Sequence, residues 1–63
     1  MPPRVATEQA AHTLAAAIIE DVFEHTEPGH EAAQMQRGRE RFADQVVPEL
    51  QHMFDAVLAE YAI

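Results

Sequence analysis

Apolar residues recur at helical spacing along most of this chain, and the pattern predicts an all-helical fold. In the first helix, expected over residues 7–26, Ile19 and Phe23 widen a stripe made of Ala11, Leu14, Ala15, Ile18 and Val22. The apolar arc covers roughly half of the circumference, which is more than one neighbouring helix would bury. We therefore expect this helix to contact at least two others.

Both ends of the first helix carry recognisable signals. Thr7 is the expected N-cap, and Glu8 places a negative charge in the first turn. Pro28 disfavours the helical conformation at the residue before it and is tolerated at a first helical position. The segment E-H-T-E-P-G-H-E, residues 24–31, is therefore interpreted mainly as a corner between two helices, with the second expected over residues 29–46.

The second helix places Met35, Phe42 and Val46 on the same face as Gly38. This glycine either allows another helix to approach closely or weakens its own helix by about 1 kcal/mol relative to alanine. Periodicity does not decide between these readings.

The third helix, expected over residues 48–62, has the strongest periodicity in the chain. Pro48 follows Val46-Val47 without Gly, Asn or Ser nearby, so we expect a sharp kink rather than a hairpin. If the first two helices pair antiparallel, the apolar stripe of residues 50–61 extends past them with no partner in the same chain. A large exposed apolar patch is a liability, so another subunit or protein should cover it.

The predicted fold class is thus all-α: a helical hairpin with a kinked second arm, completed as a multi-helix bundle by homodimerisation, with a tetramer as the next possibility. Residues 1–6 form an extended arm, and residues 7–63 form one helical domain. A 63-residue chain without cysteine has a marginal core, which favours association. The predicted interface residues are Leu50, Met53, Phe54, Val57, Leu58, Tyr61, Ile19, Phe23 and Arg39.

The arginines have separate interpretations. Arg39 lies either along the edge of the core with its aliphatic stem packed, or pairs with Glu20 or Asp21 across an interface. Arg37 and Arg41 fall on the polar side of the second helix, where Asp44 is an i+3 partner for Arg41.

Eleven acidic residues against four arginines give a formal charge of −7. This charge disfavours direct binding to nucleic acid or anionic membranes and suits a basic or neutral protein partner. The longest apolar stretch, Leu14 to Ile19, is far short of the roughly 20 residues that cross a bilayer. Polar residues interrupt the apolar run that a signal peptide would need, so a cytoplasmic location is expected.

The chain contains no Ser, Cys or Lys, which argues against covalent catalysis, and we expect neither enzymatic activity nor a cofactor. Carboxylates and imidazoles remain as possible metal ligands. Two E-x-x-H spacings, Glu27–His30 and Glu49–His52, resemble the pairs that face the core of di-iron bundles. Here Glu27 precedes a proline and the second pair faces away from the apolar stripe, so only a site between subunits fits.

The leading hypothesis is a small, acidic, non-enzymatic interaction module that is homo-oligomeric and regulates or assists a partner. One alternative is an acidic inhibitor or antitoxin-like protein that masks a basic, nucleic-acid-binding surface of its target. The other alternative is a metal-binding helical bundle that uses Glu49, His52, His25 and His30.

Overall fold

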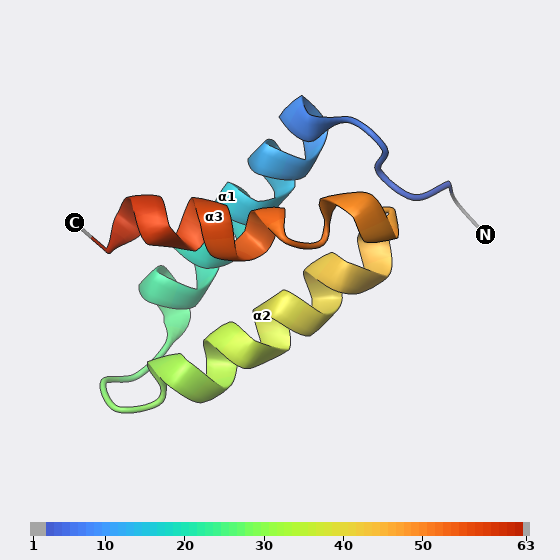
Figure 1. Cartoon of the computed structure of the whole chain (residues 1–63). Helices are drawn as coiled ribbons and strands as arrows, with labels where there is room; N and C mark the ends of the chain where they lie inside the picture. Colours follow the sequence, from blue (N-terminus) through green and yellow to red (C-terminus); the bar gives the residue numbers. More distant parts are fainter. Residues whose placement is uncertain (1–2, 63) are drawn as a thin grey trace.

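The computed structural model describes residues 3–62, and these form three α-helices: α1 (Glu8–His25), α2 (Glu31–Gln45) and α3 (Met53–Tyr61). A 3₁₀ turn, Pro48–Leu50, connects α2 to α3. This part of the chain contains no strand, so the all-α prediction is confirmed. The parts of the predicted arm and domain that fall on residues 1–2 and 63 lie outside the described residues. Helices α2 and α3 both pack against α1, and α3 crosses in front of it in Figure 1.

Helix α1 begins where its sequence predicts. Its interior lacks Gly and Pro and is rich in alanine, the best helix former. The Thr7 hydroxyl oxygen accepts a hydrogen bond from the Ala10 backbone N–H at 3.3 Å, which confirms Thr7 as the N-cap. The expectation that α1 contacts two other helices is also confirmed, although both belong to the same chain.

The corner between α1 and α2 is a tight turn at Pro28 and Gly29, and α2 begins at Glu31 rather than at residue 29. Gly29 has a φ of 94°, a left-handed conformation that glycine adopts at no steric cost. The His30 N–H donates to the Glu27 carbonyl at 3.0 Å, and the Gly29 N–H donates to the Glu31 carboxylate at 2.9 Å. The two residues that could have opened the helix therefore form the turn instead.

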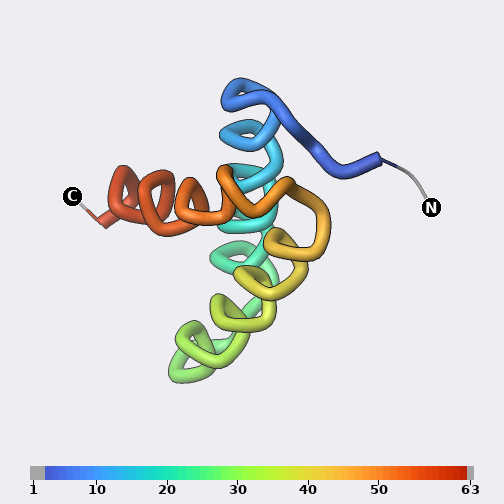
Figure 2. The backbone as a smooth tube through the Cα atoms, turned by 45° about the vertical axis from the view of Figure 1, so that its right-hand side comes forward, coloured from blue at the N-terminus to red at the C-terminus, as the bar shows by residue number. Residues whose placement is uncertain are grey.

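The connection from α2 to α3 differs from the predicted kink. Val46 and Val47 are extended, with ψ angles of 156° and 151°, and Pro48 then opens the 3₁₀ turn. This geometry agrees with the restriction that a proline places on the residue before it. After the turn, α3 runs back across α1 (Figures 1 and 2). The chain therefore reverses direction here, and the kinked second arm is wrong.

The N-terminal segment holds this extended connection in place. The Val5 N–H donates to the Gln45 carbonyl at 2.7 Å, and the Val47 N–H donates to the Val5 carbonyl at 2.9 Å. Val5 and Val46 thereby form an isolated parallel bridge. Buried backbone groups need such partners, and Val46 is fully buried.

The reversal places the apolar stripe of α3 in the chain's own core, so the prediction that it lacks a partner in the same chain is wrong. Leu50, Phe54 and Val57 are 8%, 0% and 2% exposed. Phe54 packs against Phe42 of α2, with ring centroids 5.6 Å apart. The buried core consists of Ala11, Ala15, Ile18, Ile19, Val22, Met35, Phe42, Val46, Leu50, Phe54 and Val57. Within residues 3–62, none of the helices has the length and apolar character needed to span a membrane.

Candidate functional site

The nine predicted interface residues separate into three groups. Ile19, Leu50, Phe54 and Val57 are buried inside the chain, whereas Met53, Leu58 and Arg39 are half-buried at the edge of the core. Phe23 and Tyr61 are 50% and 39% exposed. Homodimerisation stays a prediction, and any interface between intact subunits has to use the side chains that remain on the surface.

Phe23 of α1 and Tyr61 of α3 form an aromatic patch on this surface. Their ring centroids lie 6.2 Å apart and the ring planes are tilted by 41°. Among residues 3–62 these are the two large hydrophobic side chains that stay exposed. Exposed aromatic pairs on a folded chain are typical of binding surfaces, because Tyr and Phe add much contact area for few rotatable bonds.

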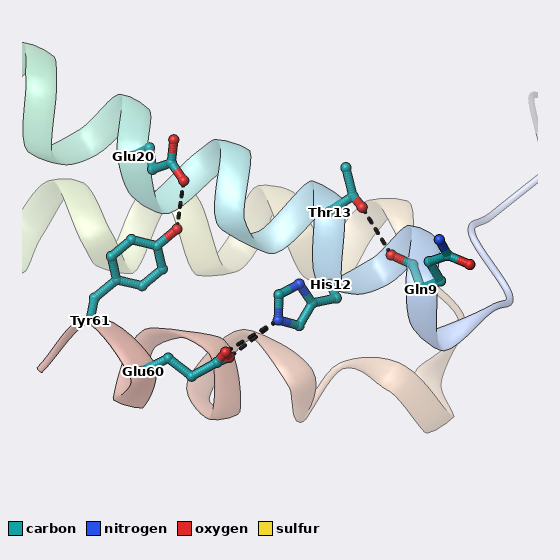
Figure 3. Close-up of polar contacts among 6 residues, drawn as sticks. All are labelled: Gln9, His12, Thr13, Glu20, Glu60 and Tyr61. Atoms are coloured by element: carbon teal, nitrogen blue, oxygen red, sulfur yellow. Dashed lines mark hydrogen bonds and ion pairs between the residues drawn. The ribbon is translucent and has the colours of Figure 1, made fainter. Parts of the chain in front are cut away.

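The Tyr61 hydroxyl donates a hydrogen bond of 2.6 Å to Glu20 Oε2 of α1 (Figure 3). This hydrogen bond is the largest influence raising the pKa of Tyr61 above its ordinary value of 10.0, followed by desolvation and by the charges of Glu20 and Glu60. The phenol therefore stays protonated at neutral pH and remains a hydrogen-bond donor. The bond fixes the orientation of the Tyr61 ring.

A second polar link ties the end of α3 to α1. His12 Nε2 lies 3.2 Å from Glu60 Oε2 and 3.3 Å from Glu60 Oε1 (Figure 3). Both side chains are about half exposed, so solvent screens their attraction. The pair joins α3 to α1 at the residue before Tyr61.

Carboxylates border the aromatic patch. Glu20 is bonded to Tyr61, Glu60 precedes Tyr61 in the chain, and Glu24 is the exposed neighbour of Phe23. An apolar centre with a negative border is complementary to a surface that combines apolar and basic side chains. The arrangement is therefore suited to recognition of such a surface.

Arg39 is held within the chain. Its Nη2 and Nε donate to Asp55 Oδ1 at 2.6 Å and 3.1 Å, and its Nη1 donates to Gln36 Oε1 at 2.6 Å. The guanidinium carbon lies 5.6 Å from the centroid of the Phe54 ring. Of the two readings of Arg39, the packed position at the core edge is correct, and its acidic partner is Asp55 of α3.

The candidate metal ligands do not converge in one chain. No group of three or more His, Asp or Glu side chains is placed to hold a metal ion in the part of the chain that the structure describes. His25 Nδ1 lies 3.0 Å from Asp21 Oδ1, as an i,i+4 pair on α1. His30, Glu49 and His52 are exposed.

No match to this chain was found among known protein families, curated proteins or solved structures.

Sequence reasoning missed the polar contacts that assemble the patch, Glu20–Tyr61 and His12–Glu60. Each contact joins α1 to α3 across more than 40 positions in the sequence. In the sequence, the residues of both pairs lie beside the apolar stripes, and this position was the one indication of such contacts. Pairing them requires knowledge of how α3 crosses α1, which helical periodicity does not contain.

Proposed function

We propose that this protein is a small, acidic, non-enzymatic interaction module that binds a partner protein through the aromatic patch. The observation that carries the proposal is the exposed Phe23–Tyr61 pair, at 50% and 39% exposure, held side by side by two helices. Aromatic side chains of this kind dominate the energetics of many protein interfaces.

The patch is organised before binding. The hydrogen bond from Tyr61 to Glu20 and the contact with Phe23 already restrict the tyrosine ring, so less conformational entropy is lost when a partner binds. Two aromatic rings are too small for a whole interface, since stable complexes bury about 800 Å² on each side. The partner must therefore also cover the carboxylates around the rings.

These carboxylates favour a partner with basic and apolar groups. A protein that masks a basic, nucleic-acid-binding surface of its target is one specific form of this function, and the net charge of −7 supports it. Such binding weakens as salt rises, because salt screens charges that attract across the interface.

Homo-oligomerisation is the second candidate, favoured by the small core and by the exposed rings. A symmetric pairing through the aromatic patch would bring the acidic borders of two copies together. Self-association of this kind therefore strengthens as salt rises, which is the opposite of binding to a basic partner.

Two measurements distinguish binding to a basic partner from homo-oligomerisation. Light scattering at several protein concentrations and two salt concentrations reports self-association. Fluorescence anisotropy with a labelled amphipathic helical peptide of leucine and lysine reports binding to a basic, apolar ligand. We expect Phe23→Ser to weaken peptide binding by about tenfold or more, as for an interface hot spot.

Ala33→Ser is the matched control, because Ala33 is exposed on α2 and outside the aromatic patch. It should bind like the wild type. Equal peptide affinity of Phe23→Ser and the wild type would exclude the aromatic patch as the binding surface.

A further inference from the structure

A groove between the C-terminal half of α1 and the outer side of α2 carries two arginines with no partner. Arg37 and Arg41 lie one turn apart on α2, and within residues 3–62 neither guanidinium makes an ion pair or a hydrogen bond. The expected pair between Arg41 and Asp44 is not formed. The chain has eleven acidic residues, so a shortage of carboxylates does not explain why these arginines are unpaired.

Arg39, on the same helix, differs from Arg37 and Arg41 because its guanidinium group is paired. It makes three hydrogen bonds and lies over an aromatic ring. Arg37 and Arg41 are exposed, with both guanidinium groups available to a ligand. The unpaired arginines are therefore a local feature of this face of α2.

Neutral hydrogen-bonding groups line the groove beside the arginines. Thr26 supplies a hydroxyl group and Gln34 a side-chain amide, both half-buried and without side-chain hydrogen bonds within the described residues. The groove has a volume of about 370 Å³, with Val22 also in its wall. It is large enough for a tetrahedral oxyanion together with part of the molecule that carries it.

Asp21 contributes a carboxylate to the same groove, and it is engaged by a neighbour. His25 Nδ1 lies 3.0 Å from Asp21 Oδ1 and 3.1 Å from the Asp21 carbonyl oxygen. The groove thus contains two guanidinium groups and one carboxylate, and that carboxylate faces the His25 ring.

We propose that this groove binds a dianionic phosphate group, either free phosphate or the phosphate of a small-molecule monoester, through Arg37 and Arg41. A guanidinium presents N–H groups in a planar fork that matches phosphate oxygens in a bidentate manner. Residues at i and i+4 of a helix have Cβ atoms about 5–6 Å apart, so both forks can reach one dianionic group. A carboxylate carries only one negative charge, so two guanidinium groups should bind it less tightly than a phosphate dianion.

This site is separate from the aromatic patch. Asp21 and Phe23 are two residues apart on α1, so their side chains project from nearly opposite sides of the helix. Phosphate binding therefore goes beyond the proposed function, and a Phe23→Ser variant should retain it.

The test is an NMR titration of ¹⁵N-labelled protein with inorganic phosphate, phenyl phosphate and acetate at constant ionic strength. We expect saturable shifts at the Nε–H groups of Arg37 and Arg41 and at the Thr26 amide. Tighter binding of phenyl phosphate than of inorganic phosphate identifies a phosphorylated small molecule as the ligand, whereas equal binding identifies phosphate itself.

Arg37→Gln and Arg41→Gln should each weaken phosphate binding by about tenfold or more, the loss expected for a charge-assisted hydrogen bond. Arg4→Gln is the matched control, because Arg4 is exposed, is unpaired within residues 3–62 and changes the net charge equally. Absence of saturable shifts in the wild type, equal binding of acetate, or an equal loss in Arg4→Gln would each overturn the proposal.

Discussion

Gly38 of α2 lies so close to Ile18 of α1 that a methyl group added at Gly38 would come within 2.8 Å of Ile18 Cγ2. The same methyl group would lie 3.7 Å from the Phe54 ring of α3 and 3.7 Å from Val22 Cγ2. Side chains from two other helices therefore converge on this glycine. Of the two readings that the sequence left open, close helix approach is the correct one.

Replacing Gly38 with alanine should lower the free energy of unfolding by about 1 kcal/mol. Alanine gains about 1 kcal/mol in helix propensity, but overpacking a tight core costs about 1–3 kcal/mol. Ile18 is β-branched and its Cγ2 moves little without a change of rotamer. Urea denaturation of Gly38→Ala, Ile18→Ala and the double variant measures the coupling, and the double variant should lose less than the two single losses together. A Gly38→Ala protein more stable than the wild type would contradict this account.

Gly29→Ala should also destabilise the protein, for a different reason. A Cβ at Gly29 would meet nothing within 4 Å, so packing is not affected. The φ of 94° is costly for residues with a side chain, by roughly 1–2 kcal/mol. Gly29→Asn should lose less than Gly29→Ala, because asparagine tolerates the left-handed region better. Equal stability of all three proteins in urea would show that the turn at residues 28–29 relaxes freely.

Titration of Tyr61 should give a pKa above 10.0, and Glu20→Ala should lower it toward that value. Tyr61 is the single tyrosine of the chain, so its ultraviolet absorbance near 295 nm reports ionisation directly. Because the folded-state pKa is raised, the associated stabilisation is fully present below pH 10.0 and is lost as the pH rises through the folded-state value. His12→Ala, which breaks only the Glu60 link, is the control and should change the pKa less. A Tyr61 pKa unaffected by Glu20→Ala would show that this hydrogen bond does not form in solution.

Phe54→Ala should leave little folded protein at room temperature. The loss of a buried phenylalanine costs about 3–5 kcal/mol, which matches the roughly 3–5 kcal/mol that one core supplies in a chain of this size. Circular dichroism measures the effect, with Ala56→Ser, exposed on the same helix, as the control. Since Phe54 is buried by its own chain, a monomeric protein should have a melting temperature that does not depend on protein concentration. A melting temperature that rises with concentration would indicate that self-association stabilises the folded chain.

The parts of this fold that could be predicted from the sequence depend on neighbouring residues. Thr7 caps α1 through a bond to Ala10, and Pro28 with Gly29 forms the corner from adjacent positions. The path of α3 could not be predicted in this way. The extended Val46–Val47 segment is stabilised by hydrogen bonds to Val5, about 40 positions earlier in the chain, and no local pattern announces that pairing.

The candidate binding surfaces show the same limit. Helical periodicity identifies both Phe23 and Tyr61, but as parts of an interface that another subunit is expected to cover. Only the crossing of α3 over α1 places the two rings together and buries the rest of the stripe. The groove with Arg37 and Arg41 likewise depends on which side of α1 the second helix occupies.

The packing of both other helices on α1 has a consequence for the order of folding during synthesis. Helix α1 and the segment before it contact partners that are translated much later, since Glu20 pairs with Tyr61 and Val5 with Val46. One apolar side of α1 therefore stays uncovered until α3 has been translated. The three-helix core can close only after that point, because the side chains that cover this side of α1 are made last among those of the core.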